Sequence, residues 1–510
     1  MKHFATFITV SFLIAEGIPD AAVIDHSDKI AYESRQEAVL IDTTCMLWTQ
    51  KHEAIAYSPI VDAIQTANRG WYLTGQVYVH QAPGDFSFWV NDCVYDEYLL
   101  GKGLYPNSVA GTHAYVSFAT QVDLMYGRMV AQYQIGGWFS SNWASPLDLG
   151  PGDLDVHKVI GKILPDGNIL FIGVTYTDSI IYKTWDSTLT NPIASGILAT
   201  GVNYWGFDIN GGIAYVFYND NWNSSIVYDT VIYYKTTTDG INWSTEQIWS
   251  LAFTPPYPNT DIKWRQMALT DDAQPRLVFD AIDYSDFSYP FYGKVYVSHT
   301  SGVPPVELTA ALGDTETIYP TIACGGGEAV AIFNVPRNNL EDTLNWWDIH
   351  YCYSTDNGIT WSEPNNLTEA SSRRVGLQHI AKRIDILRNL FFYIYLTTWY
   401  ENVDPLWVEW FGDGSLYYVF CGRAPIVGIH EEINIQPKQK LVIYPNPAKD
   451  VLYVNFASNE PPAVRLFNCL GQIVYSGTIN NQCKINVSFL PRGVYFIDVI
   501  GLRKKIVLTK

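Results

Sequence analysis

The chain has 510 residues, with 51 Asp or Glu against 32 Lys or Arg and a formal net charge of −19. This length exceeds what one ordinary hydrophobic core serves, so two or more domains are expected. The charge is uneven, because residues 441–510 hold eight basic and three acidic residues, which leaves 24 basic and 48 acidic residues for 1–440. A body that acidic repels nucleic acid and anionic membranes, so we expect no nucleic-acid partner.

The composition favours β-structure, since 15% of the residues are aromatic and only 16% are charged. Seven cysteines form no CxxC pair and no Cys/His metal spacing, which excludes a dense disulfide scaffold. Cys469 and Cys483 are either a disulfide or two small buried residues. Asp153 and Asp155 could offer two carboxylates to Ca²⁺, but two ligands are too few to form a site. We therefore expect no metal site and no cofactor.

The first 17 residues have the pattern of a secretory signal peptide. Lys2 and His3 precede an apolar run from Phe4 to Ala15, and Ala15-Glu16-Gly17 offers a small-residue cleavage site. That run is short for a bilayer span, and no later stretch reaches the roughly 20 apolar residues that a span needs. We expect an exported protein without a transmembrane span.

Six segments share a short apolar run, a turn and a strand, and their starts lie roughly 50–60 residues apart, as in four-stranded propeller blades. They are Tyr105–Thr120, Val156–Tyr176, Trp205–Asp220, Gln266–Ile282, Tyr319–Val335 and His379–Thr398. Another alternating strand follows each, the last at Leu406–Trp410. The repeats predict an all-β fold, a six-bladed β-propeller over residues 18–425, with seven blades as the alternative. Glu37–Trp48 and Gly70–His80 are expected to close the ring.

Tyr233–Trp243 and Tyr351–Trp361 align without a gap and contain a characteristic turn. In the later copy the Asp carboxylate can bind its own loop, and the Gly can take a positive φ. The pattern Ser-x-Asp-x-Gly-x-Thr-Trp resembles the Asp-box, or BNR repeat, of sialidase-superfamily propellers, which implies a structural rather than catalytic turn. The earlier copy has Thr238 in place of Asp356, so its turn should be weaker. The structural residues are Ser354, Asp356, Gly358 and Trp361, and Thr236, Asp239, Gly240 and Trp243.

After a connector at 426–440, residues 441–510 alternate in period two between turns and predict a small immunoglobulin-like β-sandwich. This stretch resembles the type A C-terminal sorting domain of the type IX secretion system of Bacteroidetes-type bacteria. The resemblance implies that the secretion machinery is a partner and that the protein is secreted or placed on the outer-membrane surface. The residues that carry it include Tyr444, Pro445, Asn446, Pro447, Gly471, Gly493, Tyr495 and Lys510.

The apparent catalytic motifs of the sequence are incomplete. His430-Glu-Glu-Ile-Asn434 lacks the second His of a zinc HExxH motif, and the chain has no Phe/Tyr-Arg-Ile-Pro motif of the kind by which sialidases resemble one another. No Tyr nucleophile with a Glu partner can be singled out, so no catalytic residue is assigned.

Ligand-binding candidates lie near the starts of the expected innermost strands, where a propeller has its ligand face. Aromatic rings can stack on sugars, and Arg can bind a carboxylate with two nitrogens; packing between blades is the alternative role of the aromatic residues. The candidates are His157, Tyr204, Trp205, Trp264, Arg265 and Arg374. We expect a non-catalytic ligand- or glycan-binding module, with a glycan-active hydrolase of sialidase-like fold and a structural surface module as alternatives.

Overall fold

The structure of the protein is a computed structural model. It covers residues 37–44, 54–69, 76–95, 102–111, 113–123, 126–150, 156–175, 177–202, 205–219, 231–254, 260–283, 292–313, 317–336, 347–368, 374–398, 417–426, 442–444, 448–455, 463–468, 473–478, 482–499 and 502–509. The expected signal peptide, residues 427–440 of the connector, and Leu406–Trp410 lie outside these ranges. Within them the chain is all-β, apart from one short 3₁₀ helix, η4 (Ala310–Leu312). No helix in the described part is long and apolar enough to cross a membrane.

Up to residue 426, the described residues form seven antiparallel sheets of four strands. In chain order the first six are β2 (Ile55–Ser58), β3 (Ala63–Arg69), β4 (Val77–Pro83) and β5 (Val90–Tyr95); β6 (Lys102–Ala110), β7 (Ala114–Asp123), β8 (Tyr126–Tyr133) and β9 (Leu147–Asp148); β10 (Val156–Ile163), β11 (Ile169–Thr175), β12 (Ile180–Trp185) and β13 (Pro192–Ala199); β14 (Trp205–Asn210), β15 (Ile213–Tyr218), β16 (Val231–Thr237) and β17 (Gln247–Ser250); β18 (Thr260–Leu269), β19 (Pro275–Asp283), β20 (Tyr292–Ser298) and β21 (Val306–Glu307); β22 (Ile318–Gly325), β23 (Glu328–Pro336), β24 (Trp347–Ser354) and β25 (Asn365–Asn366).

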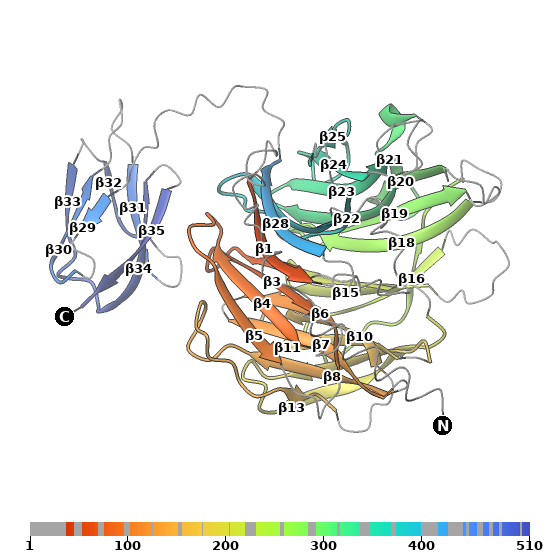
Figure 1. Ribbon diagram of the computed structural model, residues 1–510, viewed down its shortest axis with the longest axis horizontal. Coiled ribbons are helices and arrows are strands. Elements are labelled where there is room, and N and C mark those ends of the chain that lie inside the picture. The colour runs from red at the N-terminus through yellow and green to blue at the C-terminus, as the bar shows by residue number, and fades with distance from the viewer. Residues whose placement is uncertain are drawn as a thin grey trace, which may run out of the picture.

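The seventh sheet joins the two ends of this region. It consists of β26 (Arg374–Ile380), β27 (Leu390–Thr398), β28 (Tyr417–Pro425) and β1 (Glu37–Thr44). β1 pairs antiparallel with β28, from Glu37 opposite Arg423 to Thr44 opposite Tyr417, and the two strands lie side by side in Figure 1. The expected closing strand near Glu37 is therefore present.

The first strands of the sheets form a closed ring. In chain order, β2, β6, β10, β14, β18, β22 and β26 each contact the next, and β26 contacts β2. Radial repetition of small sheets around an axis is the architecture of a β-propeller, which leaves few strand edges exposed. The predicted propeller is confirmed by these sheets and their arrangement (Figure 1).

The described residues contain one sheet more than the six repeats counted in the sequence. The additional sheet, β2–β5, includes Val77–His80, which were expected to close the ring against the last sheet. Its interior is unusually polar: buried Gln81 donates to Gln65 Oε1 at 2.8 Å, and Gln65 donates to the Tyr115 carbonyl oxygen at 2.6 Å. Amide side chains can be buried when hydrogen-bonded, but they weaken the apolar pattern by which blades were recognised.

Apolar side chains of neighbouring sheets interlock between the sheets. Leu170 and Ile172 of β11 share one buried cluster with Phe207 of β14 and Val216 of β15. Full burial of such a side chain contributes roughly 1.5–3 kcal/mol relative to exposure. Each sheet is too small to bury its own faces, so the ring is stabilised by the contacts between sheets.

The C-terminal residues form a separate sandwich of two sheets. Its own buried core includes Leu452, Leu466, Ile485, Ile497 and Ile506. One sheet is β29 (Val442–Tyr444), β30 (Val451–Asn455) and β33 (Gln482–Asn486), and the other is β32 (Ile473–Thr478), β31 (Ala463–Asn468), β34 (Gly493–Val499) and β35 (Leu502–Leu508).

Only some of the sorting-motif residues lie within the described part of the chain. Gly493 begins β34, and the buried Tyr495 donates its hydroxyl to the Pro491 carbonyl oxygen at 2.9 Å. Tyr444 ends β29, whereas Pro445, Asn446, Pro447, Gly471 and Lys510 lie outside the described residues, as does Cys469. The possible Cys469–Cys483 pair therefore stays a prediction.

Candidate functional site

The ends of the inner strands gather at one face of the ring. Ser58, at the end of β2, donates to the carbonyl oxygen of Gly111 just after β6, at 2.8 Å. Asn210, at the end of β14, donates to the Leu269 carbonyl oxygen at the end of β18, at 3.1 Å. The Gly326 N–H after β22 donates to Asp271 Oδ2 after β18, at 2.7 Å. The inner strands therefore run in one direction and finish at one end of the channel, here called the turn end.

Two basic residues that follow β26 reach across the channel at the turn end. The Arg383 guanidinium binds both carboxylate oxygens of Asp208 in β14, with Nη2–Oδ1 and Nη1–Oδ2 distances of 3.0 Å. Lys382 Nζ donates to Gln266 Oε1 of β18 at 3.1 Å and to the Met267 carbonyl oxygen. The seventh sheet is thereby tied to the fourth and fifth.

Asp208 is the fully buried centre of this cluster. It also accepts the Leu269 N–H at 2.8 Å, and Lys162 Nζ lies 3.9 Å from its Oδ1. Burial raises the pKa of Asp208, but the Arg383, Lys162 and Lys382 cations and the Leu269 hydrogen bond outweigh it, so the pKa lies below its usual value. Asp208 is therefore a charged structural anion near neutral pH rather than a proton donor.

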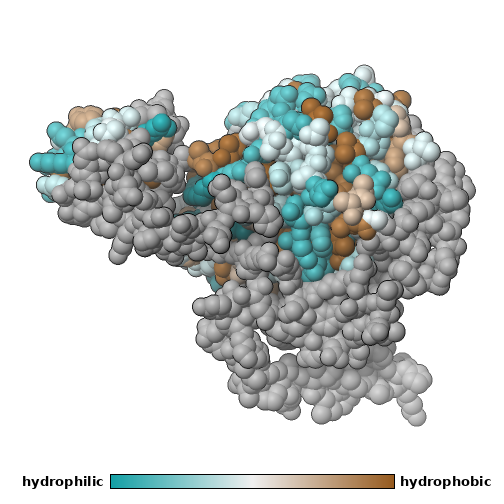
Figure 2. Space-filling model, turned by 90° about the horizontal axis from the view of Figure 1, so that it is seen from above, coloured by the Kyte–Doolittle hydropathy of each residue, from teal (hydrophilic) through white to brown (hydrophobic). Residues whose placement is uncertain are grey.

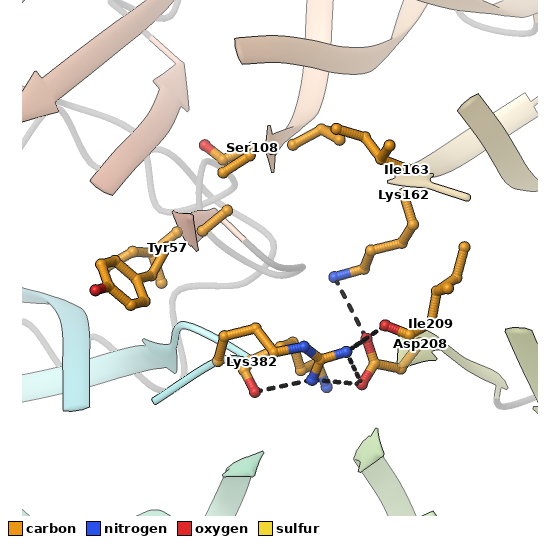
Figure 3. Close-up of a pocket in the computed structure, with 12 residues that line it drawn as sticks. Tyr57, Ser108, Lys162, Ile163, Asp208, Ile209 and Lys382 are labelled. Atoms are coloured by element: carbon orange, nitrogen blue, oxygen red, sulfur yellow. Dashed lines mark hydrogen bonds and ion pairs between the residues drawn. The ribbon is translucent and has the colours of Figure 1, made fainter. Parts of the chain in front are cut away.

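A cavity of about 100 Å³ adjoins this cluster. Besides the charged residues, its lining includes Tyr57 of β2, Ser108 of β6 and Ile163 of β10. Figure 3 shows the Lys162 side chain directed into the space between Ser108 and Asp208. We call this space the channel cavity. None of its residues was among the sequence-based candidates.

The predicted ligand residues lie toward the other end of the channel. His157 is the second residue of β10, Trp205 is the first of β14, and Arg374 is the first of β26. Trp264 and Arg265 lie in the middle of β18. The strand starts thus place His157, Trp205 and Arg374 at one mouth, here called the start mouth. Tyr204 lies outside the described residues. Trp205 is partly buried and packs on the cluster between the third and fourth sheets, as the packing alternative expected.

Five inner strands carry bulges, with the extra residues always on the inner strand. His157 lies outside the pairing of β10 with β11, and Arg265 lies outside that of β18 with β19. A bulge redirects a side chain out of the strand's alternation and is frequent next to binding sites. The register shifts lie between Leu104 and Asn107, Val156 and Lys158, Trp264 and Gln266, Ile318 and Thr321, and Gly376 and His379.

Tyr319 occupies the bulge of β22 with φ of 55°. A positive φ is rare for a bulky residue and stores backbone strain. Both neighbouring sheets fix this conformation: the Tyr319 N–H donates to Asp280 Oδ2 at 3.0 Å, and Gln378 Nε2 donates to the Tyr319 carbonyl oxygen at 2.7 Å. No local sequence pattern around Tyr319 predicts this conformation, because contacts from the two neighbouring sheets specify it.

Two histidines of the sixth and seventh sheets, His350 in β24 and His379 in β26, are poor bases. Burial, followed by the Lys382 charge, lowers the pKa of His379 to about 3, and burial lowers that of His350 to about 4 despite the opposing Asp348 carboxylate. Both imidazoles are therefore neutral near pH 7 and too weakly basic for efficient proton abstraction. The described residues contain no cluster of three His, Cys, Asp or Glu side chains that could hold a metal ion.

The turn at Ser354–Trp361 has the geometry that its residues predict. Asp356 Oδ1 accepts the Thr360 N–H at 2.8 Å, and the Ser354 hydroxyl accepts the Gly358 N–H at 2.8 Å, with Gly358 at φ of 78°. Burial raises the pKa of Asp356, but hydrogen bonds from Thr360, Ser354 and Ile359 together outweigh it and lower the pKa to about 2. Arg276 of the preceding sheet donates to the Asn357 carbonyl oxygen.

The earlier turn corrects the ungapped alignment. Thr237, not Thr236, accepts the Gly240 N–H, at 2.9 Å, and Asp239 Oδ1 accepts the Ile241 and Asn242 N–H groups, each at 2.8 Å. The turn is one residue shorter between Asp and Gly than the later one, so the strand before it is displaced by one position. Hydrogen bonds from Ile241 and Asn242 hold the pKa of Asp239 below its usual value. The expectation of a weaker turn finds no support in these bonds.

A third turn of this kind joins β12 to β13 and was missed in the sequence. Asp186 Oδ1 accepts the Thr190 N–H at 2.8 Å, and Oδ2 accepts the Asn191 N–H at 3.1 Å. Leu189, with φ of 53°, takes the conformation for which a glycine was sought. The sequence features that could have revealed this turn are the Asp186 carboxylate and its position directly after a strand.

Residues 442–509 match the protein family described as "Secretion system C-terminal sorting domain". The tail is a type IX sorting domain. The protein is thus secreted or exported to the outer-membrane surface, with the secretion machinery as a partner. No curated protein matches the chain.

Two solved structures are similar to this chain at low identity. An ulvan lyase of polysaccharide lyase family PL25 is 10% identical, with a TM-score of 0.48 over 72% of this chain and 93% of its own. The sialidase of Trypanosoma rangeli with the inhibitor DANA is 9% identical, with a TM-score of 0.37 over 60% of this chain and 55% of its own.

Proposed function

We propose that the protein is an exported, non-catalytic binding protein whose propeller takes a glycan at the start mouth. The supporting observation is the set of bulges in the inner strands, in which His157 and Arg265 are extra residues. Repeated bulging of strands around one channel is expected where side chains must be redirected toward a ligand. Arg and aromatic residues suit the polar groups and ring faces of sugars.

The charges beside the inner strands favour binding over hydrolysis. Glycoside hydrolysis uses two carboxyl groups separated by roughly 5–9.5 Å across the substrate. Asp208 and Asp280 are fully buried, and each is bound to protein groups. A carboxylate enclosed in this way supports neighbouring strands rather than exchanging protons with a sugar. These two residues thus give no support to an acid/base pair.

A glycan array probed with the full chain tests the proposal. We expect selective binding, and we expect His157→Ala and Arg265→Ala each to weaken it at least about tenfold, the loss of roughly one charge-assisted or polar contact. Ser195→Ala, on the exposed outer strand β13, is the matched control and should bind normally. An array without selective binding, or turnover of chromogenic glycosides by the unaltered protein, would contradict the proposal.

Tyr319→Gly separates binding from folding. Glycine tolerates a φ of 55° without the Cβ penalty, so the variant should unfold at the same or a slightly higher temperature. If the strained conformation of Tyr319 serves ligand binding, the same variant should bind glycan at least about tenfold more weakly. A large fall in melting temperature with normal binding would show that Tyr319 serves packing instead.

A further inference from the structure

Three segments that lie far apart in the sequence meet at one end of the C-terminal sandwich. Val487, just after β33, donates its N–H to the Asp450 carbonyl oxygen in the turn before β30, at 2.8 Å. Ala448 in the same turn donates its N–H to the Val507 carbonyl oxygen of β35 at 2.8 Å, and its own carbonyl oxygen accepts the Thr509 N–H at 2.7 Å. We call this end of the sandwich the motif end, and it consists of residues 448–450, 487–492 and 508–509.

The motif end adjoins the sequence signature of the sorting domain. Pro447 directly precedes its first segment, Gly493 directly follows its second, and Lys510 directly follows its third. Figure 1 marks the C-terminus on the side of the sandwich away from the ring, and Figure 2 shows the sandwich beside the ring. The fold therefore joins segments that neighbour separate parts of the signature.

The segment between β33 and β34 holds a large apolar side chain in solvent. Phe489 is 62% exposed, the one large hydrophobic residue that is so exposed among the described residues of the sandwich. The buried Leu490 beside it donates its N–H to the Val487 carbonyl oxygen at 3.0 Å. The buried Tyr495 donates its hydroxyl to the Pro491 carbonyl oxygen at 2.9 Å. An aromatic side chain on a backbone fixed in this way loses little conformational freedom on binding, which suits it to anchor an interface.

The motif end also carries positive charge. Arg492 is exposed three residues after Phe489, and Lys449 is exposed in the turn before β30. The exposed Asp450 is the only acidic residue of the motif end. The tail as a whole holds eight basic and three acidic residues, whereas residues 1–440 hold 24 and 48. The motif end therefore complements an acidic surface, and the acidic body disfavours an anionic membrane as that surface.

We propose that the motif end is the surface of this protein that the type IX secretion machinery binds. Phe489 enters an apolar pocket of the machinery, and Arg492 and Lys449 face carboxylates around that pocket. Aromatic and Arg side chains carry most of the binding energy in many interfaces, while complementary charges speed the encounter and select the partner. The proposal rests on the sorting-domain match of residues 442–509 and is independent of the proposed glycan site, which lies in the propeller.

Export of the full chain in a bacterium that has a type IX system tests the proposal. Phe489→Ser removes the apolar ring, and we expect it to lower the fraction at the surface or in the medium at least about tenfold, with the remainder in the periplasm. Phe489→Gln should be exported as poorly, whereas Phe489→Trp keeps an aromatic ring and should be exported well. Because the Phe489 side chain is largely exposed, the melting temperatures of these purified variants should match that of the unaltered chain.

Arg492→Met and Arg465→Met are a matched pair that tests the charges. Both arginines are exposed in the sandwich. Arg465 lies in β31 opposite Asp498, near the end of β34 that is remote from Gly493. Arg492→Met should lower the exported fraction at least about threefold, because it removes a charge that faces the partner, and Arg465→Met should leave that fraction unchanged.

Normal export of folded Phe489→Ser, or equal losses of export in Arg492→Met and Arg465→Met, would overturn the proposal. A Phe489→Ser chain that melted at a much lower temperature would show that Phe489 stabilises the sandwich instead, and would also overturn it. Binding of the full chain to phosphatidylglycerol vesicles that required both Phe489 and Arg492 would identify a lipid surface as the partner, and would overturn the choice of a protein.

Discussion

Replacement of Asp208 by Asn is expected to lower the free energy of unfolding by about 3–5 kcal/mol. Asparagine keeps the shape but not the charge, so Arg383 would remain inside the channel without its carboxylate partner. The Leu269 N–H would also lose a charged acceptor. Chemical denaturation of the full chain, followed by tryptophan fluorescence, measures the loss as a shift in midpoint.

Asp148→Asn is the matched control for this variant. Asp148 pairs with Arg128 at 3.2 Å, but the two side chains are 26% and 47% exposed. Exposed ion pairs contribute about 0.2–1 kcal/mol because water and salt screen them. Equal losses in the two variants would mean that the Asp208 cluster does not tie the ring together.

The Asp208 effect should also depend on pH. The pKa of Asp208 is depressed in the folded protein, so its ionisation contributes stability above the ordinary carboxyl pKa of about 3.9. That contribution is lost as pH falls through the folded pKa. The stability difference between the unaltered protein and Asp208→Asn should thus stay constant from about pH 5 to pH 8 and shrink only below about pH 4. A difference that vanished near pH 6 would point to a histidine instead.

Local pattern was sufficient to predict the repeated sheets and the tail. The apolar and aromatic residues of β12 and the turn residues Ser354, Asp356 and Gly358 each lie within a few consecutive positions, where one strand or one turn defines them. The tail was recognised for the same reason, since its turn and strand signals recur over 70 residues. The sheet β2–β5 was not predicted as a blade, because buried Gln65 and Gln81 stand where aliphatic residues usually mark one.

Long-range contacts could not be predicted in this way. Asp208 and Arg383 are 175 residues apart and meet only because the ring brings the fourth and seventh sheets to one channel. Neither residue has a local motif around it, and Lys382-Arg383 reads as an ordinary polar turn. The one-residue displacement before Asp239 was hidden similarly, because an ungapped alignment preserves Gly240 and Trp243 while it shifts the preceding strand.

Deletion of Leu441–Lys510 is expected to leave a folded propeller that no longer crosses the outer membrane. The sandwich has its own core, and the ring closes through β1 and β28 rather than through the tail. The melting temperature of the truncated protein should therefore match that of the propeller transition in the full chain. Cell fractionation should find the truncated protein in the periplasm, and the full chain at the surface or in the medium.

A reciprocal fusion tests whether the tail is sufficient for export without the propeller. Residues 427–510 attached behind a signal peptide and an unrelated periplasmic reporter should carry that reporter across the outer membrane, because the sorting domain acts as an independently folded unit. Asp208→Asn gives a second control, since it weakens the ring without touching the tail and should still be exported when folded. A truncated propeller that reached the surface as efficiently as the full chain would show that export depends on the ring, and the sandwich would then need another role.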